Sequence, residues 1–73
     1  MSRDILDALK KKYEAEVDIA KATIQVYLDK AVGMGEHPQF VHEIDKQLDV
    51  IATAEEKIEV LKKHYPTEDD IPF

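Results

Sequence analysis

The segment Val32-Gly33-Met34-Gly35-Glu36-His37-Pro38 is the one break between two long amphipathic stretches of this chain. Gly33 stands where the residue after a helix commonly adopts a left-handed conformation. Pro38 suits the first turn of a following helix, because an N–H group at that position has no helical partner. A connection this short makes consecutive helices antiparallel neighbours. The sequence therefore predicts a two-helix hairpin over residues 1–65, with helices at about 3–32 and 38–64 and a loop at 33–37.

Apolar residues recur every three or four positions on both sides of the break, as they do along one face of an α-helix. Before it they are Leu6, Leu9, Tyr13, Val17, Ala20, Ile24, Tyr27 and Ala31. After it they are Phe40, Ile44, Leu48, Ile51, Ile58, Leu61 and Tyr65, with Val41 alongside and Ala54 near the middle. We expect the two stripes to pack against each other. Pro66 should end the second helix, since the residue before a proline avoids the α region.

The first helix carries a second apolar face, called here the apolar strip. Its members are Ile5, Ala8, Ala15, Ile19, Ala22 and Val26. A chain of 73 residues buries too little surface for a large core. We therefore expect hairpins to pair through the apolar strip, most simply as a two-fold dimer that forms a four-helix bundle. A folded monomer is the alternative.

The composition limits the classes of function. The net charge is -6, and the only basic run, Lys10-Lys11-Lys12, spreads its charges around a helix, so direct binding to a phosphate backbone is not expected. The chain has no cysteine, which removes disulfides and thiolate chemistry from consideration. Neither a membrane-spanning run nor a signal-peptide pattern occurs. We expect a cytoplasmic protein.

No group of residues has the spacing of a catalytic or metal site. His37 and His42 lie five positions apart with a proline between them, unlike the i, i+4 pairs that bind zinc on a helix. Asp45 and Asp49 share a helix face without a nearby Glu-x-x-His element. The glycines of the break follow a helix rather than a strand, so they do not form a phosphate-binding loop. We expect neither enzymatic activity nor a metal or cofactor.

The sequence closes with an acidic tail at 66–73 whose last residues are Glu68-Asp69-Asp70-Ile71-Pro72-Phe73. A terminal phenylalanine offers a large ring and a free α-carboxylate on one residue. An apolar pocket rimmed by arginine or lysine can hold both groups at once. The fixed φ of proline narrows the conformations of the free tip, so that docking costs less entropy.

The residues Asp69-Asp70-Ile71-Pro72-Phe73 resemble the C-terminal tip of bacterial single-stranded DNA-binding protein. The resemblance covers only these residues, because nothing upstream has the alternating strands or the aromatic platform of that family's OB-fold. In that family the tip recruits genome-maintenance proteins. The resemblance therefore implies partners such as a RecQ-type helicase, exonuclease I, the helicase PriA, RecO, or the chi subunit of the replicative polymerase.

Three functional hypotheses follow. The first is a protein-interaction adaptor or competitor that presents residues 68–73 to replication and repair proteins, as a small phage or mobile-element product that redirects host proteins would do. The second is a structural helical bundle of a larger assembly, in which the tail only aids solubility. The third is an acidic DNA mimic, which is weakened because the acidic residues are interleaved with ten lysines and arginines.

Overall fold

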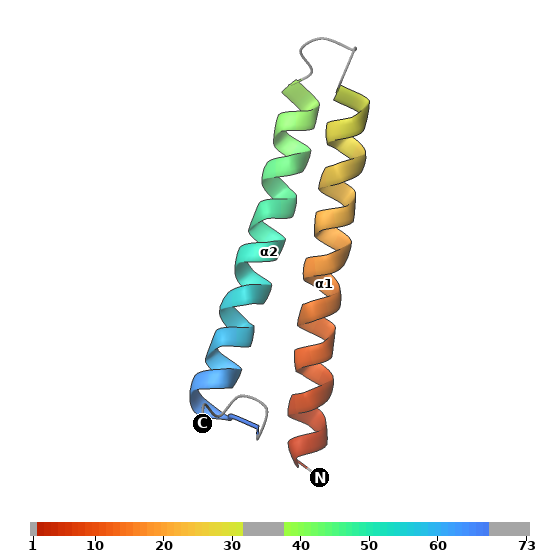
Figure 1. The fold of residues 1–73 in the computed structure, drawn as a ribbon. Helices are drawn as coiled ribbons and strands as arrows, with labels where there is room; N and C mark the ends of the chain where they lie inside the picture. Colours follow the sequence, from red (N-terminus) through yellow and green to blue (C-terminus); the bar gives the residue numbers. More distant parts are fainter. Residues whose placement is uncertain (1, 32–37, 68–73) are drawn as a thin grey trace, which may run out of the picture.

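The structure is a computed structural model that describes residues 2–31 and 38–67. Helix α1 (Ser2–Ala31) and helix α2 (Pro38–His64) lie side by side and run in opposite directions (Figure 1). The all-α hairpin fold predicted from the sequence is confirmed. The predicted loop at 33–37 lies outside the described residues, as do residues 68–73 of the predicted tail.

Charged residues at the helix ends and short-range pairs support each helix locally. Asp4 lies in the first turn of α1 and Lys30 in its last turn, so each charge opposes the partial charge of the helix terminus. On α1 the Arg3 Nε donates to Asp7 Oδ1 at 3.0 Å, and the Gln25 Nε2 donates to Asp29 Oδ1 at 2.9 Å. Such pairs contribute only about 0.2–0.5 kcal/mol each. Packing between the helices must therefore supply most of the stability.

The two helices meet along a seam whose positions alternate in steps of four and three residues. On α1 these positions are Leu6, Lys10, Tyr13, Val17, Ala20, Ile24, Tyr27 and Ala31, and on α2 they are Phe40, Ile44, Gln47, Ile51, Ala54, Ile58 and Leu61. None of these side chains is exposed. An average step of about 3.5 residues keeps one face of each helix turned toward its partner, as in a coiled coil.

The centre of the seam is formed by small side chains. Within 2–31 and 38–67 the buried hydrophobic residues are Val17, Ala20 and Ala54, which are 7%, 1% and 3% exposed. Larger residues line the seam toward the loop, where the rings of Tyr27 and Phe40 lie 5.7 Å apart. Alanine at the centre lets the two backbones approach closely, whereas toward the loop the space between the helices is filled by the aromatic pair.

Two residues assigned to the α2 stripe from the sequence do not lie in the seam. Leu48 is 52% exposed, and Gln47 occupies the half-buried position instead. Tyr65 follows the end of α2 and is 53% exposed. Val41, predicted to lie alongside the stripe, is 69% exposed. The reason is the seam's alternating spacing, which selects position 47 between 44 and 51 whether or not that residue is apolar.

A single seam leaves much of the chain in water. The accessible surface is 5856 Å² for a mass of 8.4 kDa, and a globular protein of that mass exposes roughly 4,600 Å². The radius of gyration is 16.2 Å, compared with roughly 11 Å for a globular chain of this length. Each helix therefore buries one face and leaves the others exposed.

The close packing at Ala20 predicts a strong effect of side-chain size. Ala20→Leu should lower the free energy of unfolding by about 1–3 kcal/mol, because the added carbons would force the helices apart. Thermal unfolding followed by circular dichroism measures this change. Ala52→Leu, on the exposed side of α2, is the matched control and should change stability little. Equal effects of the two substitutions would contradict the packing described.

Candidate functional site

The end of α2 is attached to the start of α1, where the predicted tail begins. The amide N–H of Tyr65 donates to the carbonyl of Leu61 at 2.8 Å, which completes the last turn. The Arg3 Nη1 donates to the carbonyl oxygen of Tyr65 at 2.6 Å, while its Nε binds Asp7. One guanidinium therefore links α1 to the first residue after α2. Both chain segments lie at the same end of the hairpin (Figure 1).

The predicted partner-binding residues begin three positions beyond this link. Glu68, Asp69, Asp70, Ile71, Pro72 and Phe73 lie outside the described residues. The described chain ends with Pro66, which is exposed, and Thr67, which is half-buried. The structure thus describes the base of the tail, fixed beside Arg3, and not the tip itself.

The apolar strip predicted on the first helix lies on one side of α1. Its six residues are all exposed, and the three largest, Ile5, Ile19 and Val26, are 65%, 66% and 51% exposed. At about 100° per residue, the centre of the strip lies roughly 150° around α1 from the centre of the seam. The strip therefore faces almost directly away from α2.

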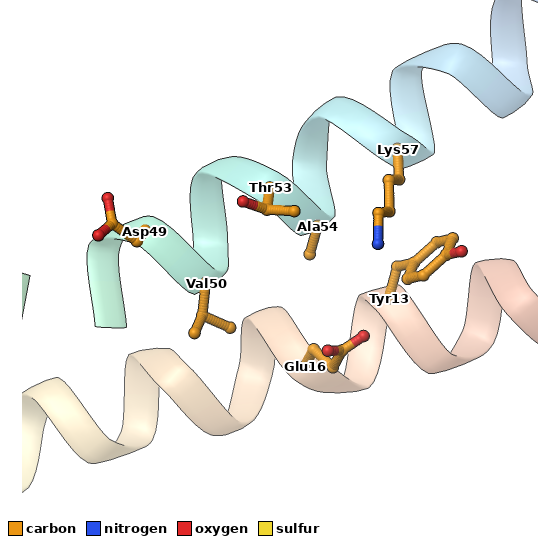
Figure 2. Close-up of a pocket in the computed structure, with 7 residues that line it drawn as sticks. All are labelled: Tyr13, Glu16, Asp49, Val50, Thr53, Ala54 and Lys57. Atoms are coloured by element: carbon orange, nitrogen blue, oxygen red, sulfur yellow. The ribbon is translucent and has the colours of Figure 1, made fainter. Parts of the chain in front are cut away.

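A groove of about 260 Å³ follows one edge of the seam (Figure 2). It is lined by Tyr13, Glu16, Asp49, Val50, Thr53, Ala54 and Lys57. The Lys57 Nζ lies 5.1 Å from the centre of the Tyr13 ring, a cation–π contact that bridges the two helices. With a lysine, two carboxylates and a phenol on its walls, the groove has mixed charge and no nucleophile beside a histidine base.

The opposite edge of the seam is acidic. Glu14 and Glu55 line both grooves on this side, together with Ile58. Glu59 and Lys62 line the groove nearer the end of α2. Carboxylates from both helices therefore flank the seam and add to the negative potential of a chain that carries a net charge of -6.

Within residues 2–31 and 38–67, no three His, Cys, Asp or Glu side chains converge on a point where they could hold a metal ion. His42 and His64 are exposed. The centres of the His64 and Tyr65 rings lie 6.5 Å apart in an edge-on arrangement. Asp45 and Asp49 are also exposed. His37 and Glu36 lie outside the described residues.

No protein-family model matches the chain, and searches of curated proteins and of solved structures found no match either. No helix in the described parts of the chain has the length and apolar character needed to cross a membrane. Function therefore has to be argued from the chain's own residues.

Two features of the site were missed by the sequence analysis. One is the bond from Arg3 to Tyr65, which joins residues 62 positions apart. The other is the groove with Lys57 above Tyr13. The antiparallel arrangement does bring position 3 near position 65, but an arginine near a helix start has no sequence signature that specifies a backbone carbonyl as its acceptor.

The link at the base of the tail can be tested by removing the guanidinium. Arg3→Ala should increase backbone motion at Tyr65, Pro66 and Thr67, because the Tyr65 carbonyl loses its donor from α1. Stability should fall by no more than about 1.5 kcal/mol, as expected for an exposed hydrogen bond. Amide relaxation measured by NMR, where an N–H is present, gives the local motion. Lys11→Ala, with an exposed lysine on the same helix, is the control and should leave these residues unchanged.

Proposed function

We propose that this protein is a non-enzymatic adaptor or competitor that presents a tip like that of single-stranded DNA-binding protein to DNA replication, repair or recombination proteins. The observation that carries the proposal is the residue order Asp69-Asp70-Ile71-Pro72-Phe73, preceded by Glu68. The candidate partners are those implied by the resemblance: a RecQ-type helicase, exonuclease I, PriA, RecO and the polymerase chi subunit.

Each residue of the tip has a separate role in the proposed contact. Phe73 inserts its ring into an apolar pocket, and its α-carboxylate, which must be free, pairs with an arginine on the partner. Ile71 and Pro72 pack on the pocket rim. Asp69 and Asp70 interact with basic residues around it, which accelerates association more than it strengthens the final complex.

The hairpin supports this role in two ways. The hydrogen bond from Arg3 to the Tyr65 carbonyl fixes where the tail leaves the body. The grooves lined by Glu14 and Glu55 carry negative charge on the body, so the body also attracts a basic partner surface. Recruitment and blocking use the same tip contact, and the proposal includes both.

Pairing of hairpins into a dimeric four-helix assembly is part of the proposal. Two tips on one assembly would raise avidity for a target that offers two sites within reach. The support is the exposed apolar strip, whose large members Ile5 and Ile19 are about two-thirds exposed at 65% and 66%.

The same strip supports a second candidate function. A helical rod with an unpaired apolar face can serve as a structural component of a larger assembly, with a tail that only aids solubility. In that case the strip, rather than the tip, would hold the partner. The two functions therefore assign the essential contact to different parts of the chain.

Deletion of Phe73 separates these functions. We expect it to weaken binding to exonuclease I or to a RecQ-type helicase by at least about thirty-fold, because a buried aromatic anchor at an interface is worth about 2 kcal/mol or more. Fluorescence anisotropy of the labelled protein measures the affinity. A synthetic tail peptide with an amidated end should lose affinity similarly, because it lacks the carboxylate.

Ile19→Asp is the matched control, since it alters the apolar strip and leaves residues 68–73 intact. It should retain the affinity of a single tip. Circular dichroism should show equal helicity with and without Phe73. Binding that survives the deletion but is lost in Ile19→Asp would reject the adaptor and favour the structural component.

A further inference from the structure

The apolar strip has a regular internal order. Alanines recur every seven residues at Ala8, Ala15 and Ala22. Lys12 and Ile19 lie between them, and Ile5 and Val26 lie at the two ends. All seven positions are exposed on α1. This is a second seam with the same alternating spacing as the seam against α2. A heptad of alanines allows another helix to approach closely, and the flanking isoleucines supply the area that it buries.

The spacing of the strip is nearly symmetric about Ala15, and its residue types match in both directions except that Lys12 mirrors Ile19. Ile5 and Val26 lie at its ends, and Ala8 and Ala22 are equidistant from Ala15. A two-fold axis through Ala15 therefore places Ala8 beside Ala22 of a second copy and pairs the large end residues with each other. The strip is complementary to itself in the antiparallel direction, as a two-fold interface requires.

The charges beside the strip favour the same direction. Lys11 and Asp18 lie on one edge of the strip, nearly equidistant from Ala15, and both are exposed. An antiparallel pair sets each Lys11 beside Asp18 of the second copy, twice per dimer. A parallel pair would set opposite edges of the strip together, with Lys11 near Glu16 of the second copy. It would also bring the two Lys12 side chains of the strip itself to the same level, which is repulsive. On the other edge Glu16 approaches its own equivalent near the axis, next to the groove that contains Lys57.

The area that the hairpin leaves exposed is large enough for an interface with a second copy. The chain exposes 5856 Å², which is roughly 1,200 Å² more than expected for its mass. A standard stable interface removes roughly 800 Å² from each partner. One pairing along α1 would therefore bring the exposed surface of each chain close to that of a globular protein.

We infer that two copies of this chain pair through the apolar strip, with the two α1 helices antiparallel and the two-fold axis near Ala15. Because the strip lies roughly 150° from the seam, α1 of the second copy stands on the far side of α1 from α2. The four helices form an open row, α2–α1–α1–α2, rather than the closed square of a four-helix bundle. This inference deepens the proposed function. The role of the pair in presenting two tips rests on that function.

The row determines where the two tails begin. Each tail base is fixed beside Arg3, twelve residues from Ala15. In the antiparallel pair the two Arg3 residues are therefore about 36 Å apart along the helix axis, at 1.5 Å per residue. The six residues 68–73 can extend by at most about 20 Å. Two tips held at opposite ends of a rod reach two partner molecules, or two distant sites, rather than one pocket.

Disulfide trapping tests the arrangement directly, because the chain has no cysteine of its own. Ala15→Cys should form a disulfide-linked dimer under mild oxidation, since the two positions face each other at the axis. Ala8→Cys and Ala22→Cys should each fail to cross-link alone, with about 21 Å between equivalent positions, and should cross-link when mixed. Ala52→Cys on α2 is the control and should remain monomeric in denaturing gels.

Sedimentation of the full chain gives an independent measurement. The unmodified protein should sediment as a dimer and Ile19→Asp as a monomer, while Val41→Asp, which is equally exposed on α2, should remain dimeric. A monomeric unmodified protein, or self-cross-linking of Ala8→Cys, would overturn the inference. Cross-linking of Ala15→Cys should be unaffected by deletion of Phe73. Loss of partner binding without loss of cross-linking would thus reject the proposed function alone.

Discussion

The close approach of α1 and α2 at Val17, Ala20 and Ala54 is the constraint on which the rest of this structure depends. Among the residues that the structure describes, these are the buried hydrophobic ones, and two of the three are alanines. A seam whose centre consists of such small side chains holds two helices together but covers only one face of each. The remaining surface is therefore free to contact other molecules, and the residues along it differ from one region to the next.

That pattern separates three regions by their position around the seam. One edge forms a groove in which Lys57 caps the Tyr13 ring, and the other edge presents carboxylates from both helices. The third region, the apolar strip, faces away from α2. A helix with two apolar seams on nearly opposite sides is suited to the interior of a layer. By contrast, α2 has one seam, and its outer positions mix charged residues with scattered exposed apolar ones such as Val41 and Leu48, which suits the edge of a layer. This asymmetry between the helices is what makes an open row more consistent with the chain than a closed bundle.

The fold was largely predictable because the hairpin depends on local signals. The spacing of apolar residues, Pro38 at the start of α2 and the lysines at its end each act within a few residues. The errors arose where apolarity and spacing disagree: Leu48 was assigned to the core, but the seam passes through Gln47. Tyr65 was assigned to the apolar stripe of the second helix, but it follows the last helical residue, His64, and is exposed. The same holds for the candidate site. The tip was predicted from the order of its residues, whereas the hydrogen bond from Arg3 to Tyr65 at the base of the tail was not predicted.

By itself the sequence determined that this protein has two helices, that they are antiparallel, and that one of them has a second apolar face. The helices and the second apolar face follow from periodicity, which is a property of each helix alone, and the antiparallel arrangement follows from the short connection between them. Only the tertiary structure decided which residues fill the seam, that Arg3 binds the Tyr65 carbonyl, and that the strip is left uncovered. Those outcomes depend on the register between the helices, and register is set by the packing of both faces together rather than by either segment on its own.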